Sequence, residues 1–243
     1  MESNTSYTKI IIAAFFILCS SHPLFGQDQA ITPEQSKQII SKIQSKLSPL
    51  YKKYIGIAYI QEATTKTYDA KSGELKKTSF VKRSKRDYFY KEPEITALEY
   101  KKNGKDQPLS DYKPSDKVLP IFYVFDESGP EQYEREVIDQ QMINGQPCYH
   151  LQITPKTKTP RHIIGDMYFT ENKLDLIYRH VNPAELSFPV KSYEGKQTYS
   201  SLEGIPVPVS AHLEILVRIP FVLNERIVVD ATYSEIQLIS PSE

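Results

Sequence analysis

The sequence has no tryptophan, little cysteine and glycine, and no surplus of charge of either sign. Its 243 residues include two cysteines and nine glycines, and 30 basic side chains balance 30 acidic ones. A neutral chain offers no general attraction to nucleic acid or to an anionic surface, so nucleic acid is not expected as a partner. Once an N-terminal leader is removed, Cys148 alone remains, and no internal disulfide can stabilise the fold.

The short motifs of catalysis are also missing. The chain has no Gly-x-Ser-x-Gly elbow, no glycine-rich phosphate loop and no Cys-x-x-Cys pair. His150, His162, His180 and His212 fall on separate expected strands without the spacing of a zinc motif. We therefore expect no enzyme, no catalytic residue, no metal and no cofactor. A hydrolase remains an alternative only if a serine, a histidine and an aspartate from distant segments converge.

The one long apolar run lies near the N-terminus. Lys9 precedes Ile10–Leu18, which has the length of a signal-peptide core and is too short to span a bilayer. We expect residues 1–26 to be a signal peptide cleaved after Gly26, and residues 27–243 to form one exported domain. The alternative is a lipid anchor on Cys19, but the bulky Leu18 before it favours soluble export.

A helix is predicted directly after this leader. Thr32 has the side chain of an N-cap, Pro33 suits the first helical position, and Gln35 completes a capping box. An apolar stripe then recurs at helical spacing, and Pro49 is expected to end the helix. The stripe consists of Ile39, Ile43, Leu47 and either Leu50 or Tyr51.

Most of the remaining chain alternates between apolar and polar residues with a period of two, which is typical of strands. Turns are expected at residues 71–74, at Asn103-Gly104 and at Asn144-Gly145. A proline-containing loop is expected at 105–120, with a short helix after Ser115, and a bulge is expected near Ser234. The fold class is therefore mainly β (α+β), a strongly curved antiparallel sheet or incomplete β-barrel with an N-terminal helix and a short lid helix. The concave face of such a sheet must be covered by a helix, a loop or a ligand.

The charged run Lys82–Arg86 has two interpretations. Charge runs are usually a solvated edge or turn, here between or across two strands over 78–83 and 87–91. In the second interpretation, Arg83 lies at the mouth of the concave face. Its guanidinium could donate several hydrogen bonds there to carbonyl or ester oxygens.

The segment Phe80–Glu94 resembles the LolA-type periplasmic lipoprotein carriers. In that family a strand ends in Lys-Arg-Pro, an aromatic strand and a proline follow, and a further strand leads to Asp-Gly-Lys. Here Lys82-Arg83 is followed by Ser84, and the last element is Asn103-Gly104-Lys105. The segment Leu151–Lys156 is similar to the family's Leu-Thr-Pro-Lys strand end. The C-terminal third looks more like the broader family of LolA-like outer-membrane lipoprotein-sorting proteins.

The resemblance implies an incomplete barrel around an apolar cavity with helices as a lid. Such carriers take lipoproteins from an inner-membrane transporter, shield the acyl chains, and pass them to an outer-membrane acceptor. The family's arginine at the position of Arg83 bonds to the lid backbone and helps to switch between closed and open forms.

On this basis we expect a monomeric periplasmic carrier of acylated lipoprotein or lipid. The alternative is an envelope sensor or scaffold of the same fold that binds lipid or protein and signals to a partner. The candidate cargo-binding residues, with the strand parity inferred from alternation, are Arg83, Ile57, Tyr59, Tyr88, Tyr90, Leu151, Ile153, Leu213 and Ile215.

Overall fold

The computed structural model describes residues 31–114 and 122–241. The predicted signal peptide and Cys19 lie outside these residues, so the expected cleavage or lipid anchor is not tested. No helix in the described part of the chain is both long and apolar enough to cross a membrane.

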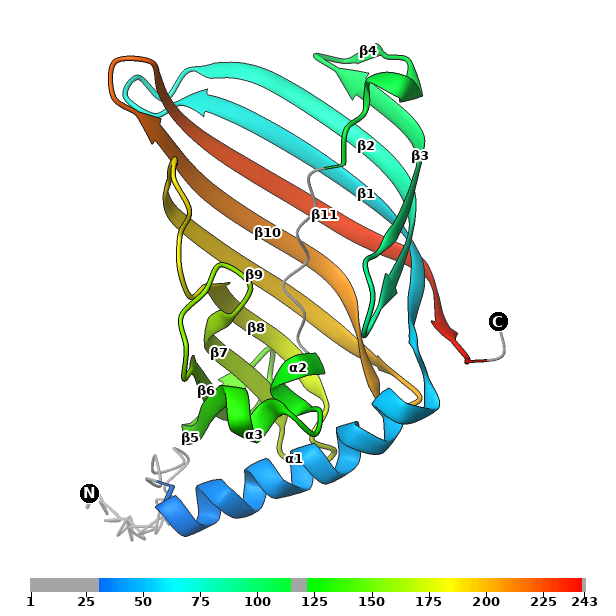
Figure 1. Cartoon of the computed structure of the whole chain (residues 1–243), viewed down its shortest axis with the longest axis vertical. Helices are drawn as coiled ribbons and strands as arrows, with labels where there is room; N and C mark the ends of the chain where they lie inside the picture. Colours follow the sequence, from blue (N-terminus) through cyan, green and yellow to red (C-terminus); the bar gives the residue numbers. More distant parts are fainter. Residues whose placement is uncertain (1–30, 115–121, 242–243) are drawn as a thin grey trace, which may run out of the picture.

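The described strands form one antiparallel sheet of eleven strands that does not close on itself (Figure 1). The order across the sheet is β4-β3-β2-β1-β11-β10-β9-β8-β7-β6-β5, so the last strand pairs with the first. This confirms the predicted curved sheet or incomplete barrel. The strands are β1 (Gly56–Asp69), β2 (Leu75–Tyr88), β3 (Glu94–Lys102), β4 (Lys105–Asp106), β5 (Tyr133–Ile143), β6 (Gln146–Pro155), β7 (Ile163–Thr170), β8 (Leu176–Pro183), β9 (Val190–Leu202), β10 (Ile205–Ile219) and β11 (Leu223–Ile239).

The N-terminal helix α1 (Pro33–Lys53) begins as predicted. The hydroxyl of Thr32 accepts a hydrogen bond from the backbone N–H of Gln35, whose side chain accepts one from the backbone N–H of Thr32. The expectation that Pro49 ends the helix is wrong, because Pro49 lies inside α1 and the helix continues to Lys53. The backbone N–H of Tyr54 then closes the last turn on the carbonyl of Leu50.

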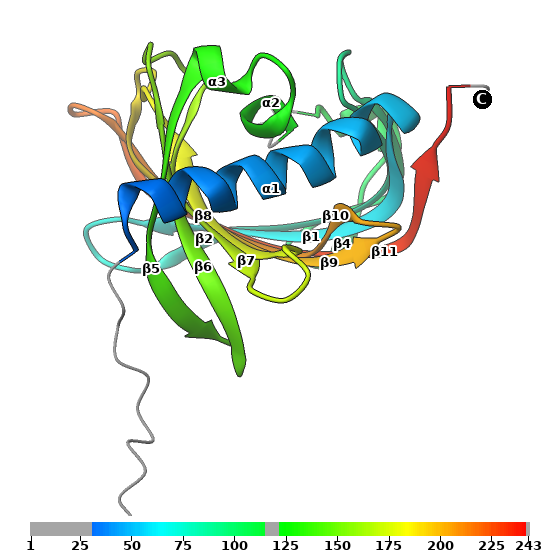
Figure 2. The same cartoon turned by 90° about the horizontal axis from the view of Figure 1, so that it is seen from below.

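Three short helical segments follow the third and fourth strands. They are η1 (Leu109–Asp111), α2 (Phe122–Phe125) and α3 (Gly129–Gln132). Figure 2 shows α1 and α2 inside the curve of the sheet, and Figure 1 shows α1 crossing the strands near one end. Because α1 is the only long helix among the described residues, it supplies most of the helical cover for the inner face.

The hydrophobic core lies between α1, α2 and the inner face of the sheet. The predicted stripe is buried on α1, with Ile43 at 0% and Leu47 at 2% exposure, and Tyr51 rather than Leu50 is its last core residue. From α2, the ring of Phe125 meets the edge of Phe169 with 5.4 Å between ring centroids. The core therefore fills one half of the inner face, which we call the lower half as drawn in Figure 1.

The predicted turns and bulge are confirmed. Asn103-Gly104 and Asn144-Gly145 both have positive φ at their two residues, as a tight hairpin turn requires. The register of β1 against β11 shifts opposite Glu235, one residue after the predicted Ser234. Beyond the bulge, β11 pairs with β1 again as far as Gly56, close to the end of α1.

The first interpretation of the charged run, as a solvated edge or a turn between two strands, is wrong. Residues 82–86 lie within the single strand β2, which pairs with β1 on one side and β3 on the other. Alternation sends Arg83 and Lys85 to the inner face and Lys82 and Arg86 to the outer face, because successive side chains of a strand point to opposite faces. Arg83 is 6% exposed and Lys85 is 4% exposed, so neither belongs to a solvated edge.

Candidate functional site

The candidate site is the inner face of the sheet, and its residues are identified by register. Tyr59 belongs to the core, so the odd-numbered residues of β1 face inward. Gln61 pairs with Arg83 on β2, and Ala63 pairs with Ala231 on β11, which in turn pairs with Ala211 on β10. Following these pairs divides the inner face into a packed lower half, a polar layer, and an upper half that the described helices leave uncovered.

Four of the predicted cargo-binding residues lie in the packed lower half. Ile57 and Tyr59 are 8% and 5% exposed, and Leu151 and Ile153 are fully buried. All four contact the core formed with α1 and α2. Their side chains already have protein partners here, so any contact with cargo would require α1 or α2 to move away. Their assignment as cargo-binding residues stays a prediction.

Tyr88 and Tyr90 do not lie in the core, and the face assumed for them is wrong. The neighbouring Phe89 is the buried residue of this segment, at 4% exposure, and its ring meets the edge of Tyr51. Tyr90 is 57% exposed, and Lys91 lies over the ring of Tyr88. The sequence Tyr-Phe-Tyr is aromatic on both faces, so alternation of apolar and polar residues could not indicate which ring points inward.

Arg83 is the centre of the polar layer: it faces inward, but it is buried in the middle of the sheet rather than at the mouth of the concave face. Its Nε donates a 2.7 Å hydrogen bond to Oε1 of Gln61, and its Nη1 donates to the hydroxyl of Tyr112. Tyr112 directly follows η1, and its ring meets the edge of Tyr100 on β3. Arg83 therefore ties the segment after β4 to the middle of the sheet.

A second polar group lies beside Arg83, closer to the core. Nζ of Lys85 is 3.0 Å from Oδ1 of Asp87, and the hydroxyl of Tyr59 donates to the other carboxylate oxygen. Burial, and next the negative charge of Asp87, raise the pKa of Tyr59 well above its usual value. The tyrosine is thus held neutral, as a hydrogen-bond donor to the carboxylate.

The polar layer continues across the inner face onto β8 and β9. The residues there were not predicted from the sequence. Arg179 on β8 donates from Nε and Nη2 to Oε1 of Gln197 at 3.1 and 2.6 Å, and the hydroxyl of Tyr199 donates to the same oxygen at 2.7 Å. Burial raises the pKa of Tyr199, and it raises that of Tyr233 to about 12. Strand alternation could have indicated this pair, because Gln197 and Tyr199 are two residues apart in β9 and must lie on the same face of the sheet.

Leu213 and Ile215 lie in the upper half of the inner face. They pair with Val229 and Ile227 on β11, and all four are half-buried. Together with Val217 on β10 they form an apolar surface above the polar layer, which we call the inner strip. Figure 1 shows that α1, α2 and α3 are gathered at the lower end of the sheet, away from the upper parts of β10 and β11. The inner strip is therefore apolar surface that the described helices do not cover.

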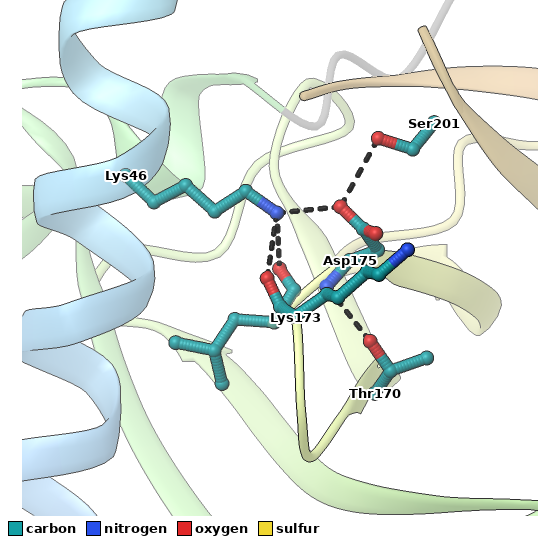
Figure 3. A network of polar contacts seen from close by, with 6 residues as sticks. Lys46, Thr170, Lys173, Asp175 and Ser201 are labelled. Carbon is teal, nitrogen blue, oxygen red and sulfur yellow. Dashed lines mark hydrogen bonds and ion pairs between the residues drawn. The ribbon is translucent and has the colours of Figure 1, made fainter. Parts of the chain in front are cut away.

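The helix α1 is fixed to the sheet by a polar clamp centred on Lys46 (Figure 3). Its Nζ lies 2.5 Å from Oδ1 of Asp175 and donates to the backbone carbonyls of Lys173 and Leu174 in the turn between β7 and β8. Ser201 on β9 donates to the same carboxylate at 3.0 Å. These contacts fix α1 to the sheet over the lower half of the inner face.

The outer face carries a groove of about 450 Å³ across the middle of the sheet. Ser210, His212 and Asp230 line it, and Nδ1 of His212 lies 2.8 Å from the carboxylate of Asp230. The hydroxyl of Ser210 instead bonds to that of Thr198 at 2.7 Å, and no hydrogen bond joins it to His212. A serine without a bonded base is not an activated nucleophile, so this groove does not form a hydrolase triad.

Two further expectations concern metal and thiol chemistry. Within residues 31–114 and 122–241, no group of three or more histidine, cysteine, aspartate or glutamate side chains could hold a metal ion. Cys148 is fully buried, and burial raises the pKa of its thiol. A raised pKa disfavours the thiolate, so Cys148 is not a reactive cysteine.

Arg83→Leu is expected to lower the free energy of unfolding by about 1–3 kcal/mol, because Gln61 and Tyr112 lose a buried charged donor. Residues 105–114 should also be cleaved faster in limited proteolysis, since Tyr112 is no longer tied to the sheet. Tyr112→Phe keeps the ring contact with Tyr100, loses only the hydroxyl, and should have a smaller effect on both measurements. Unchanged urea denaturation and unchanged cleavage of Arg83→Leu would contradict this structural role.

No protein-family model matches the chain, and no curated protein matches it either. Solved structures that are similar to it include an outer membrane lipoprotein-sorting protein domain from Vibrio parahaemolyticus, at 9% identity and a TM-score of 0.40, covering 86% of this chain and 94% of that one. A LolA superfamily protein from Nitrosomonas europaea has 9% identity and a TM-score of 0.34, covering 84% and 93%.

The MucA/MucB complex of Pseudomonas aeruginosa is also similar, at 9% identity and a TM-score of 0.26, covering 83% of this chain and 99% of that one. LolA-superfamily structures are thus among those to which the chain is similar.

Proposed function

We propose that this protein is a carrier that binds a lipid, or the acyl chains of a lipoprotein, on the inner strip of its half-barrel. The observation that supports this proposal is the inner strip itself. Its five apolar side chains are half-buried within the curve of the sheet, and the described helices do not cover them. They are Leu213, Ile215, Val217, Ile227 and Val229.

The strip suits a long apolar chain better than a compact ligand. The side chains of two adjacent strands, β10 and β11, line up along the strand direction, and the polar layer around Arg83 limits the strip at its lower end. Each methylene group moved from water onto such a surface contributes about 0.8 kcal/mol at full burial. An acyl chain of ordinary length therefore binds without any covalent chemistry. Release then requires only that the acyl chain be transferred to another apolar surface that competes for it.

The double variant Leu213→Asp with Ile215→Asp is expected to weaken binding of a fluorescent fatty acid at least about tenfold, because two carboxylates would replace apolar contacts. The matched control is Leu216→Asp, which lies on the outer side of the same strand and should bind as the parent does. Binding is measured by titration, and folding by circular dichroism. Equal affinity of the double variant and the parent, with both folded, would refute the proposal.

The wider role follows from the same proposal. We place the carrier in the periplasm, exported by the segment 1–26, with a lipid anchor on Cys19 as the alternative. Its cargo would come from an inner-membrane transporter and pass to an outer-membrane acceptor, and Arg83 would act in the switch between closed and open forms. Arg83→Leu would then block transfer of cargo between two populations of labelled vesicles, beyond what its loss of stability explains.

A second candidate function is an envelope sensor or scaffold. The observation that favours it is the packed lower half of the inner face, where Leu151 and Ile153 are fully buried against helices. A binding module with a filled interior would recognise a protein at its surface rather than carry cargo inside. If purified protein holds no lipid and takes up no fatty acid, but co-purifies with a membrane signalling protein, this candidate replaces the carrier.

A further inference from the structure

Three turns at the upper end of the sheet expose large apolar side chains to solvent. Phe221 and Val222, between β10 and β11, are 109% and 78% exposed, and Phe188, between β8 and β9, is 72% exposed. Leu75 and Leu186 contribute from the β1–β2 and β8–β9 turns. We call these five residues the apolar rim. From these residues and the charges around them, we propose that the apolar rim docks the protein onto the surface of an anionic lipid bilayer.

The three turns lie together because the strands that they connect are neighbours. The backbone N–H of Ala70 donates to the carbonyl of Asn224, and Lys76 lies within 3.8 Å of carboxylate oxygens on both Asp69 and Glu225. The backbone N–H of Arg218 donates to the carbonyl of Pro189 at 3.0 Å, which joins the remaining turn. Figure 1 shows the three turns at the same end of the sheet, opposite to α1.

The conformation of Phe221 is unfavourable for an exposed aromatic residue. The backbone N–H of Val222 bonds to the carbonyl of Ile219, and Pro220 and Phe221 occupy the two central positions of this turn. Phe221 has a φ of 62°, in a position where glycine is ordinarily preferred. A bulky residue there is disfavoured by the positive φ and by the exposure of its ring to water. Insertion of the ring into an apolar medium would offset the cost of exposure.

The charge around the rim indicates which apolar medium fits. Residues 69–77, 183–191 and 218–225, which form these turns and their flanks, hold five cations and four carboxylates, a surplus of one positive charge. Lys76 is paired with Asp69 and Glu225. The exposed cations that form no ion pair among the described residues are Lys71, Lys77, Lys191 and Arg218, against the exposed carboxylates Glu74 and Glu185. The chain as a whole is neutral, so this local surplus of positive charge is not visible in its composition. Apolar tips surrounded by cations are the pattern of a surface that enters an interface with anionic headgroups.

The apolar rim lies at the upper end of the inner strip. Val217 belongs to the inner strip, and two residues further along the same strand Ile219 opens the turn that carries Phe221. The inner strip therefore runs to the rim along β10. A bilayer at the rim would meet the apolar inner surface directly, although the docking itself needs no cargo and does not depend on the proposed carrier function.

The chain has no tryptophan, so one introduced indole reports its own surroundings. Phe221→Trp should show a blue-shifted emission with vesicles of phosphatidylcholine and phosphatidylglycerol. The matched control Met142→Trp, at a 66% exposed position next to the β5–β6 turn, should show none. Both variants are purified in the same form, so the N-terminal segment contributes equally to each.

Co-sedimentation then measures affinity. Phe221→Ser with Val222→Ser should lower binding to these vesicles at least about tenfold, and 1 M salt should weaken binding of the parent by screening the cations. The carboxylate variant of Leu213 and Ile215 should dock as the parent does. Absence of binding to any vesicle, an equal blue shift from Met142→Trp, or a rim-dependent dimer in solution without vesicle binding would each overturn the proposal.

Discussion

Phe169→Ala is expected to lower the free energy of unfolding by about 3–5 kcal/mol, the largest loss from a single substitution considered for this protein. Phe169 is fully buried on β7, at the point where Phe125 of α2 and the strands of the lower half meet. Alanine would leave a cavity that the paired strands cannot collapse to fill, because β7 is held by β6 on one side and β8 on the other.

The matched control for this prediction is Phe188→Ala. It removes the same side chain from a position that is 72% exposed, so the free energy of unfolding should change by no more than about 0.5 kcal/mol. Urea denaturation of the parent and both variants gives the comparison. Similar losses from the two substitutions would show that the lower half is not the packed core that the structure describes.

Raising the pH above about 10 is expected to unfold the protein cooperatively. Burial raises the pKa of four inner tyrosines above the ordinary value of 10.0, to about 12 for Tyr233. The others are Tyr51, Tyr59 and Tyr199. A folded pKa above the unfolded one gives stability that is fully present below pH 10 and is lost as pH rises toward the raised value.

The expected loss is roughly 1–2 kcal/mol per tyrosine at pH 11, or on the order of 5 kcal/mol for the four together. That is comparable to the whole stability of many domains, so ionisation and unfolding should occur together. The part of the tyrosinate absorbance that comes from these four side chains should appear together with the loss of circular dichroism, whereas exposed tyrosines ionise without unfolding. The absence of tryptophan keeps the absorbance signal specific to tyrosine.

Tyr233→Phe provides the matched test, because it removes one of the four buried hydroxyls. Its unfolding midpoint should move to higher pH, whereas Tyr90→Phe, at a 57% exposed position, should leave the midpoint unchanged. If the parent keeps its circular dichroism while all its tyrosines ionise, the inner tyrosines are not buried as described.

The candidate site shows where prediction from sequence reached its limit. Alternation correctly assigned Leu213 and Ile215 to one face of β10, and Arg83, which the motif singled out, is bonded to Gln61 on the inner face. Tyr112 and Arg179 were missed, because their contribution depends on which strands are neighbours in the sheet. Neither residue lies near Arg83 in the chain. No local sequence pattern distinguishes Tyr112, which bonds to a buried arginine, from a tyrosine that is simply exposed after a 3₁₀ turn.

The sequence by itself determined the features that depend on a few consecutive residues. The capping box at Thr32, the apolar stripe of α1 and the Asn-Gly hairpins are encoded locally, because caps and turns are satisfied within three or four residues. The period-two alternation likewise determined that the protein is mainly an antiparallel sheet.

Only the tertiary structure decided which part of the inner face is filled and which is left open. That depends on where α1 crosses the strands, and the crossing is fixed by contacts such as that of Lys46 with Asp175, 129 residues away in sequence. The same holds for the apolar rim, whose exposed residues come from three turns that the strand order brings together. Long-range pairing is a property of the whole sheet, so no single segment of the sequence contains it.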